Sequence, residues 1–341
     1  LSSYAGYATW SIPAVDIQPL VTLNDFDIDG NAVFDAANQN VTVGRNFTID
    51  ATATYTPGTN TTTFNGTAGQ VFTNDGTITD GLYNMSVTNS SILSVTNDLT
   101  IRNNLSLASG TIFRDMGNTV GVAANLANSG THQSQGTGSI TLNGTGEQVI
   151  SGDGSGSFGN LFINKSAGTT TATANIALTG NLRLATDNST LTIGSNRLSL
   201  SASSNVYDAL TGTTTASFSS SRMVETNGLQ SDAGMVVTFA STDSRLFPFG
   251  CDSKYTPARL QFASAPTTWG SVRISPANNQ HPLVTDANAL SYYWKVSNTD
   301  FSGIVANSMR LRLYYDDTDI QGTEANMVPA VYSPTSWTTY D

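Results

Sequence analysis

The sequence has few of the residues from which catalytic and metal sites are usually built. Its 341 residues include one cysteine, Cys251, and two histidines, His132 and His281. A single thiol excludes an intrachain disulfide. The histidines lie in unlike contexts, Gly-Thr-His-Gln and Asn-Gln-His-Pro, that offer neither a metal cluster nor a nucleophilic triad. We therefore interpret Cys251 as a small buried apolar residue and both histidines as surface-loop residues.

Charge and long apolar runs are also scarce. Charged residues make up 11% of the chain, against roughly 25% in ordinary soluble domains. The 14 Lys and Arg and 25 Asp and Glu give a net charge of −11 and form no basic stripe, which argues against nucleic acid as a partner. No apolar run reaches about 18 residues, so we predict no membrane span.

The ends of the chain suggest a piece of a longer protein. Leu1 is not Met, and neither a charged segment nor an apolar leader follows it. The chain stops directly after Ser336–Tyr340, without a polar tail. We therefore expect mature or excised sequence.

Thr, Ser, Asn and Gly replace the missing residues, and they frame short apolar triplets. Val41–Val43, Leu105–Leu107 and Leu191–Ile193 each alternate apolar, polar, apolar, with Gly or Asn close by. Alternation of period two places both apolar side chains on one face of a strand. Many very short strands with tight corners favour a parallel β-solenoid over residues 21–225, whose coils share one core. An antiparallel sandwich is the competing fold, but it would need longer strands and more two-residue turns.

An internal repeat supports the solenoid. Three segments match later ones in the same order and at nearly the same offset: Phe64–Val71 with Leu142–Val149, Asn84–Val87 with Asn160–Ile163, and Asn104–Leu107 with Asn181–Leu184. We predict a duplicated unit of about 77 residues whose copies occupy equivalent places in successive coils. Gly66 should then superpose on Gly144 and Leu105 on Leu182. The small differences between the three offsets predict loops or bulges over 70–84 and 87–104.

The composition changes after about residue 225. Aromatic residues and prolines gather there, and the alternating runs lengthen: Gly234–Phe239, Ala258–Phe262, Ser271–Ile274, Ser291–Val296 and Ser308–Tyr315. These features predict a C-terminal antiparallel β-sandwich-like domain over 226–341. The remaining part, residues 1–20, is a leading segment.

Two acidic clusters are candidate cation sites. Asp25, Asp27 and Asp29 stand at positions one, three and five of a calcium-type loop with Gly30 at position six, but position twelve is Ala36, where a bidentate Glu belongs. The competing interpretation is a strand with Phe26 and Ile28 facing the core and a turn at 29–31. We prefer this strand and expect no cofactor, with calcium as the alternative. Asp316, Asp317, Asp319 and the nearby Glu324 form the second cluster, which we interpret as a solvated strand end.

The order of several motifs resembles large cell-surface β-solenoid and adhesin-like proteins of the Bacteroidota that are exported by the type IX secretion system. The motifs cover roughly residues 20–341: Asn125–Thr131, Gln148–Gly152, Phe158–Lys165, Leu178–Leu182, Leu191–Gly194, Phe247–Gly250, Tyr255–Pro257, Tyr292–Val296 and Leu313–Ile320. The resemblance implies an exported protein that is displayed on the outer cell surface or released. The C-terminal sorting domain of such proteins is absent from this sequence.

These observations favour an extracellular structural or adhesive protein that acts as a stalk or display element, without enzymatic activity. Its expected partners are cell-surface or matrix components, glycans or copies of itself. Two alternatives stay open: a glycan-binding or polysaccharide-degrading β-helix protein, and a subunit of an extracellular filament. Glycoside cleavage needs two carboxylates at a set separation, and the predicted coils contain few acids.

Overall fold

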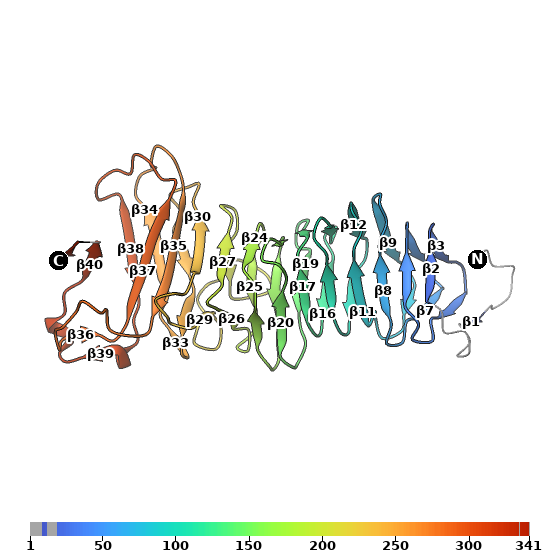
Figure 1. Cartoon of the computed structure of the whole chain (residues 1–341), viewed down its shortest axis with the longest axis horizontal. Coiled ribbons are helices and arrows are strands. Elements are labelled where there is room, and N and C mark those ends of the chain that lie inside the picture. Colours follow the sequence, from blue (N-terminus) through green and yellow to red (C-terminus); the bar gives the residue numbers. More distant parts are fainter. Residues whose placement is uncertain (1–8, 12–18, 334, 341) are drawn as a thin grey trace.

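The protein is an elongated all-β molecule built around a parallel β-solenoid of about 11 turns, which confirms the predicted fold class (Figure 1). The computed structural model describes residues 9–11, 19–333 and 335–340. The chain winds from the N-terminal end of the rod to the C-terminal end, and most coils contribute one strand to each of three faces.

The first face is one 12-stranded sheet. Its strands pair in parallel from β2 to β32, and β33 adds an antiparallel edge. The strands are β2 Leu20–Thr22, β5 Val41–Val43, β8 Thr61–Phe64, β11 Asn84–Val87, β14 Leu105–Leu107, β17 Leu126–Asn128, β20 Gln148–Ser151, β23 Thr170–Ala172, β26 Leu191–Gly194, β29 Val224–Thr226, β32 Phe249–Cys251 and β33 Lys254–Tyr255.

The second face is another 12-stranded sheet. It is parallel from β3 to β30 and antiparallel beyond. The strands are β3 Phe26–Ile28, β6 Phe47–Ile49, β9 Gln70–Asn74, β12 Ile92–Val95, β15 Ile112–Arg114, β18 Thr131–Gln133, β21 Ser157–Phe158, β24 Ile176–Leu178, β27 Arg197–Leu200, β30 Gly234–Thr238, β35 Ser271–Ala277 and β37 Tyr293–Thr299.

The third face is divided into three sheets. Two are parallel, and the third, β31-β34-β38, is antiparallel and begins where β31 takes the third position of its coil. The strands are β1 Thr9–Ser11, β4 Val33–Asp35, β7 Thr54–Thr56 and β10 Thr77–Ile78; then β13 Leu99–Ile101, β16 Thr119–Val122, β19 Ser139–Leu142, β22 Leu161–Ile163, β25 Leu182–Leu184 and β28 Val206–Tyr207; and last β31 Arg245–Phe247, β34 Ala258–Phe262 and β38 Met309–Leu313.

Small elements complete the C-terminal end. They are the strand pairs β36 Ala289–Leu290 with β39 Ile320–Gln321 and β40 Ala330–Ser333 with β41 Ser336–Thr339, and the 3₁₀ turns η1 Asp317–Asp319 and η2 Glu324–Asn326.

The long strands predicted after residue 225 are present as β30, β34, β35, β37 and β38. Parallel pairing continues beyond residue 225, since Val224 of β29 pairs with Phe249 of β32. The antiparallel strands β35 and β37 extend the second face of the solenoid.

One narrow apolar core runs along the rod because each triplet points its two apolar residues inward. Equivalent residues stack from coil to coil: the rings of Phe26, Phe47 and Phe72 lie 4.8 and 5.0 Å apart. Asparagines hold the corners, because Asn104 accepts a hydrogen bond from the backbone N–H of Asn125 at 3.0 Å, and Asn125 accepts one from Val149 at 2.9 Å. The abundance of turn Asn thus has a physical role: it satisfies backbone donors that no strand partner reaches.

The two segments of the predicted duplicated unit form corresponding strands, but their predicted placement is wrong. The first copy contains the strands β8, β9, β11 and β14, which correspond to β19, β20, β22 and β25 of the second copy. Each strand of the second copy thus lies eleven strands after its counterpart in the first. With three strands in a coil, this shift is three coils and two strands, and the second copy is therefore rotated onto a different face. Leu105 lies on the first face and Leu182 on the third, although both point inward and are fully buried.

The reason for this rotation is a mismatch of lengths. Leu105 pairs with Leu126 in the next coil, and Leu126 pairs with Ile150 in the coil after that. The duplicated unit is longer than three coils of this size and shorter than four, so it is not a whole number of coils. The predicted loop intervals contain the expected corners, but they also contain the strands β10, β12 and β13.

Candidate functional sites

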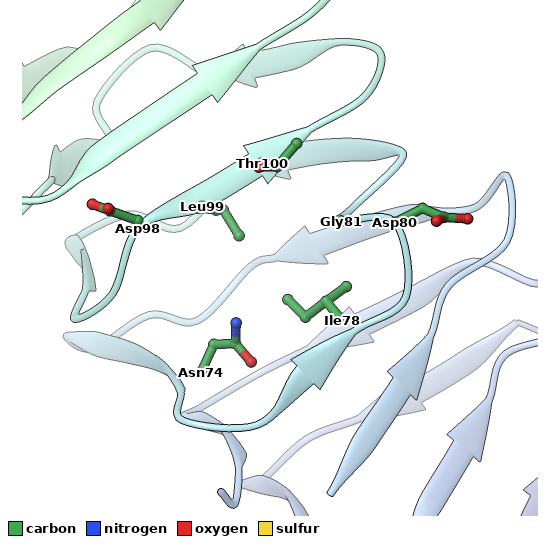
Figure 2. Close-up of a pocket in the computed structure, with 7 residues that line it drawn as sticks. All are labelled: Asn74, Ile78, Asp80, Gly81, Asp98, Leu99 and Thr100. Carbon is green, nitrogen blue, oxygen red and sulfur yellow. The ribbon is translucent and has the colours of Figure 1, made fainter.

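One hollow lies on the third face, at the seam where the sheet of β10 ends and the sheet of β13 begins (Figure 2). Its volume is about 200 Å³, and Asn74, Ile78 and Leu99 contribute to its lining. The two carboxylates, Asp80 and Asp98, lie at opposite ends of it and point away from one another (Figure 2). Asp98 accepts a hydrogen bond from the backbone N–H of Thr119 at 2.7 Å, which is a contact between coils. The seam does not place two acids across a common substrate position.

Asp25, Asp27 and Asp29 belong to the first described coil, where the interpretation as a strand is confirmed. Phe26 and Ile28 are buried on β3, and Gly30 has a φ of 58° in the turn that follows. Asp25 accepts a hydrogen bond from the backbone N–H of Asn46 at 2.9 Å and lies 3.8 Å from the Arg45 guanidinium. Among the described residues, no group of three or more His, Cys, Asp and Glu could hold a metal ion.

The second acidic cluster differs from the prediction at Asp319. This residue is fully buried and pairs with Lys254 at 2.5 Å, so the interpretation as a solvated strand end is wrong for it. The hydrogen bond to Asp319 raises the pKa of Lys254 against the opposing effect of burial. Asp317 is exposed, and Glu324 accepts a hydrogen bond from the Tyr315 hydroxyl. The buried carboxylate of this cluster is therefore already paired with a cationic side chain, that of Lys254.

His132 is not a surface-loop residue. It points inward from β18, stacks against Phe113 at 5.9 Å and is fully buried. Its Nε2 atom lies 3.1 Å from the buried carboxylate of Asp115 and 3.4 Å from the Ser134 hydroxyl. Burial raises the pKa of Asp115, but hydrogen bonds from His132, Ser134 and two backbone N–H groups outweigh it, so the pKa is lowered overall.

These three residue types are those of a serine hydrolase, but their arrangement differs. In a triad the acid and the nucleophile bind opposite nitrogens of the imidazole ring. Here both contact Nε2, and the buried Nδ1 has no hydrogen-bond partner within the part of the chain that the structure describes. Ser134 also accepts the backbone N–H of Asn160 at 2.8 Å. The group is therefore a polar insertion in the core that joins neighbouring coils.

The second histidine, His281, and the cysteine, Cys251, lie in the C-terminal part of the chain. His281 is half-buried in a loop among the rings of Tyr293, Tyr332 and Trp337, at 4.9, 5.4 and 5.0 Å. Cys251 is fully buried, as predicted, beside the Tyr292 hydroxyl at 3.5 Å, and burial raises the pKa of its thiol. No sequence signal indicated the aromatic group around His281, because its members come from three separate segments.

The most elaborate polar feature is a pair of corner glutamines that sequence reasoning recognised only as repeat markers. Gln148 accepts a hydrogen bond from the Gly144 N–H at 3.0 Å and donates to the carbonyl oxygens of Val122 and Ala124, at 2.9 and 2.5 Å. Gln70 makes the same three contacts with Gly66, Val43 and Arg45. The two glutamines thus build the same corner on different faces.

Lys165 extends the corner of Gln148. It is fully buried, and its ammonium group donates to the Gln148 side-chain oxygen at 2.9 Å and to the carbonyl oxygens of Gly144 and Gly146 at 2.7 Å. Burial lowers the pKa of Lys165. Every donor position of this ammonium is used inside the protein, so the geometry is structural.

Comparisons with protein-family models, with curated proteins and with solved structures found no match to this chain. No helix in the described ranges is long and apolar enough to cross a membrane. The fold and the side-chain chemistry above are therefore the basis for the function.

Proposed function

We propose that this protein is an extracellular structural or adhesive surface protein, in which the solenoid acts as a stalk and the C-terminal end is presented for contact. The observation that carries the proposal is the stack of about 11 parallel coils around one core. Coils that repeat about every 4.8 Å form a stiff rod, because each strand bonds to the next along the axis. Such a rod spaces and displays whatever lies at its end.

The side chains are consistent with a role that needs no catalysis. The carboxylates at the seam point apart, and His132, Asp115 and Lys165 are enclosed in the core. Outward positions of the solenoid strands are most often Thr or Ser, which suits a surface that faces water. The motif order described above is what supports export to the outer cell surface by the type IX route.

A second candidate, a filament subunit, is favoured by the C-terminal end of the rod. Val296 on β37 and Met309 on β38 pair with the buried Ile274 and Phe262 and so lie on the core side of their sheets. Their exposed fractions are nevertheless 44% and 46%. Both strands are also edges of their sheets, and an exposed edge with apolar side chains is a template for association.

Display of the full chain on a bacterial host tests the proposal. Host cells that present the chain should be retained under flow on surfaces coated with glycans or matrix proteins, above cells that present a globular protein at equal density. Equal retention on every coating would contradict the adhesive role. Electron microscopy of the purified chain at increasing concentration tests the filament, which predicts end-to-end particles.

A further inference from the structure

Three arginines lie together on the outer surface of the C-terminal part of the third face. Arg259 of β34 stands directly opposite Arg312 of β38, and Arg310 lies two residues before Arg312 on the same strand. The inward residues Leu260 and Leu311 alternate with them, so the three guanidinium groups share the outer side. Cross-strand partners are about 5 Å apart and alternate residues of one strand about 7 Å apart. We call these three residues the arginine face.

The arginine face has no acidic partner among the residues that the structure describes. The ion pairs that those residues form are Arg45 with Asp25, Arg222 with Asp187 and Lys254 with Asp319, and none of them involves the arginine face. Arg310 and Arg312 are exposed, and the contact of Arg259 is the Ser244 hydroxyl at 3.4 Å. Like charges directly opposite each other destabilise a sheet. The chain has a net charge of −11, so three adjacent arginines that repel one another are unusual in it. An external anion would relieve their repulsion.

We propose that the arginine face binds a linear anionic polysaccharide through its carboxylate or sulfate groups. A guanidinium is planar and binds such groups through two parallel hydrogen bonds, which a single ammonium does not offer. The neighbouring side chains fit a sugar chain. Gln261 is exposed beside Arg310 in the cross-strand register, and Tyr314, two residues beyond Arg312, is 47% exposed. Gln261 supplies an amide for hydroxyl groups and Tyr314 a ring for a sugar face.

A second copy of the chain is the competing occupant, and the structure favours it less. A stable protein interface needs an apolar centre, but the core-side residues of β34 point away from the arginine face. The acids of the N-terminal coils are also engaged within the rod. Asp35 and Asp50 accept hydrogen bonds from the backbone N–H groups of Ala37 and Gly30, and Asp98 accepts one from Thr119.

Binding of the purified full chain to immobilised alginate, dextran sulfate and neutral dextran tests the proposal. Alginate presents carboxylates and dextran sulfate presents sulfates, so the two arms identify the anion. The chain should bind at least one of them and not dextran, and binding should weaken between about 50 mM and about 500 mM NaCl because exposed charges are screened. The variant Arg259→Gln/Arg310→Gln/Arg312→Gln should bind on the order of ten- to a hundredfold more weakly, since each exposed charge pair is worth up to about a factor of five.

A matched variant controls for net charge. Arg45→Gln/Arg197→Gln/Arg273→Gln removes the same three charges from exposed positions elsewhere and should bind as the native chain does. The conservative change Arg312→Lys keeps the charge but removes the fork of donors, and it should weaken binding less than Arg312→Gln. Equal loss of binding in both triple variants, or no loss in either, would overturn the proposal. Failure of the native chain to bind either anionic polymer would overturn it too. Salt-sensitive self-association that disappears in the arginine-face variant would assign the face to a second copy and overturn it as well.

This inference rests on the proposed adhesive function, and the two fail in different ways. If host cells that display the arginine-face variant are retained under flow as well as cells that display the native chain, adhesion stands and the arginine face is not its cause. If cells displaying the native chain are not retained on any coating, the adhesive function itself is wrong.

Discussion

Replacing Gln148 with Met tests whether the corner glutamines hold the coils together. Met has nearly the same length and shape, so the change removes hydrogen bonds without opening a large cavity. Two backbone groups would lose their side-chain partner: the N–H of Gly144, at 3.0 Å, and the carbonyl oxygen of Ala124. The carbonyl oxygen of Val122 keeps the N–H of Asn143 at 3.1 Å, and Lys165 keeps two carbonyl acceptors.

The magnitude follows from these lost partners. A buried polar group without a partner costs about 1–3 kcal/mol. Two such groups predict that Gln148→Met lowers the free energy of unfolding by about 2–6 kcal/mol, and the Lys165 ammonium adds to the loss because it gives up the Gln148 oxygen. Gln70→Met should cost a similar amount, because Gly66 and Arg45 lose the equivalent contacts.

Urea unfolding followed by circular dichroism measures the change, and hydrogen exchange at the Gly144 amide shows whether it is local. Gln135→Met is the matched control, because Gln135 is exposed. The control should change the free energy of unfolding by no more than about 0.5 kcal/mol. A loss of less than about 1 kcal/mol for both Gln148→Met and Gln70→Met would refute the argument that these side chains satisfy buried backbone groups.

Four further predictions concern the buried pairs and the candidate sites. Hydrogen bonds hold the folded-state pKa of Asp115 below its unfolded value, so its contribution to stability is present above about pH 4 and is lost as the pH falls through the folded pKa. Asp115→Asn should therefore flatten the acid side of a profile of Tm against pH. An unchanged profile would contradict this. Lys254→Met leaves the buried carboxylate of Asp319 unpaired and should cost about 3–5 kcal/mol in urea unfolding, whereas adding Asp319→Leu should recover part of the loss; no recovery would argue against the pair. Millimolar calcium should leave the Tm unchanged, and a rise in Tm that Asp25→Asn/Asp27→Asn removes would reveal a site at the first described coil. A panel of polysaccharides and peptides should show no turnover, and turnover abolished by one carboxylate substitution would establish an enzyme.

The order of the chain along the rod was predictable because its physics is local. A triplet such as Leu105–Leu107 buries two leucines on one side of a strand whatever its neighbours are. Phe26 and Ile28 likewise fix the strand at 26–28 and leave the acids between and beside them facing outward. The C-terminal runs Gly234–Phe239 and Ala258–Phe262 also match β30 and β34 within a residue. Local alternation was thus sufficient for the class of fold and for most strands.

The face on which each strand lies was decided only by the tertiary structure, because it depends on the summed length of all preceding corners. For this reason the duplicated unit places Gly66 and Gly144 at like corners of different faces. Burial of polar residues was equally hidden, since His132 and Asp319 acquire their partners Asp115 and Lys254 across coils or across 65 residues. The arginine face forms in the same way: Arg259 and Arg312 are far apart in the chain, and only the antiparallel register of β34 and β38 sets them side by side. The sequence by itself determined the strands, their alternation and the turn residues, which are properties of a few neighbouring residues. The stacking of the coils and the antiparallel pairing at the C-terminal end decided which side chains meet, because that requires the whole path of the chain.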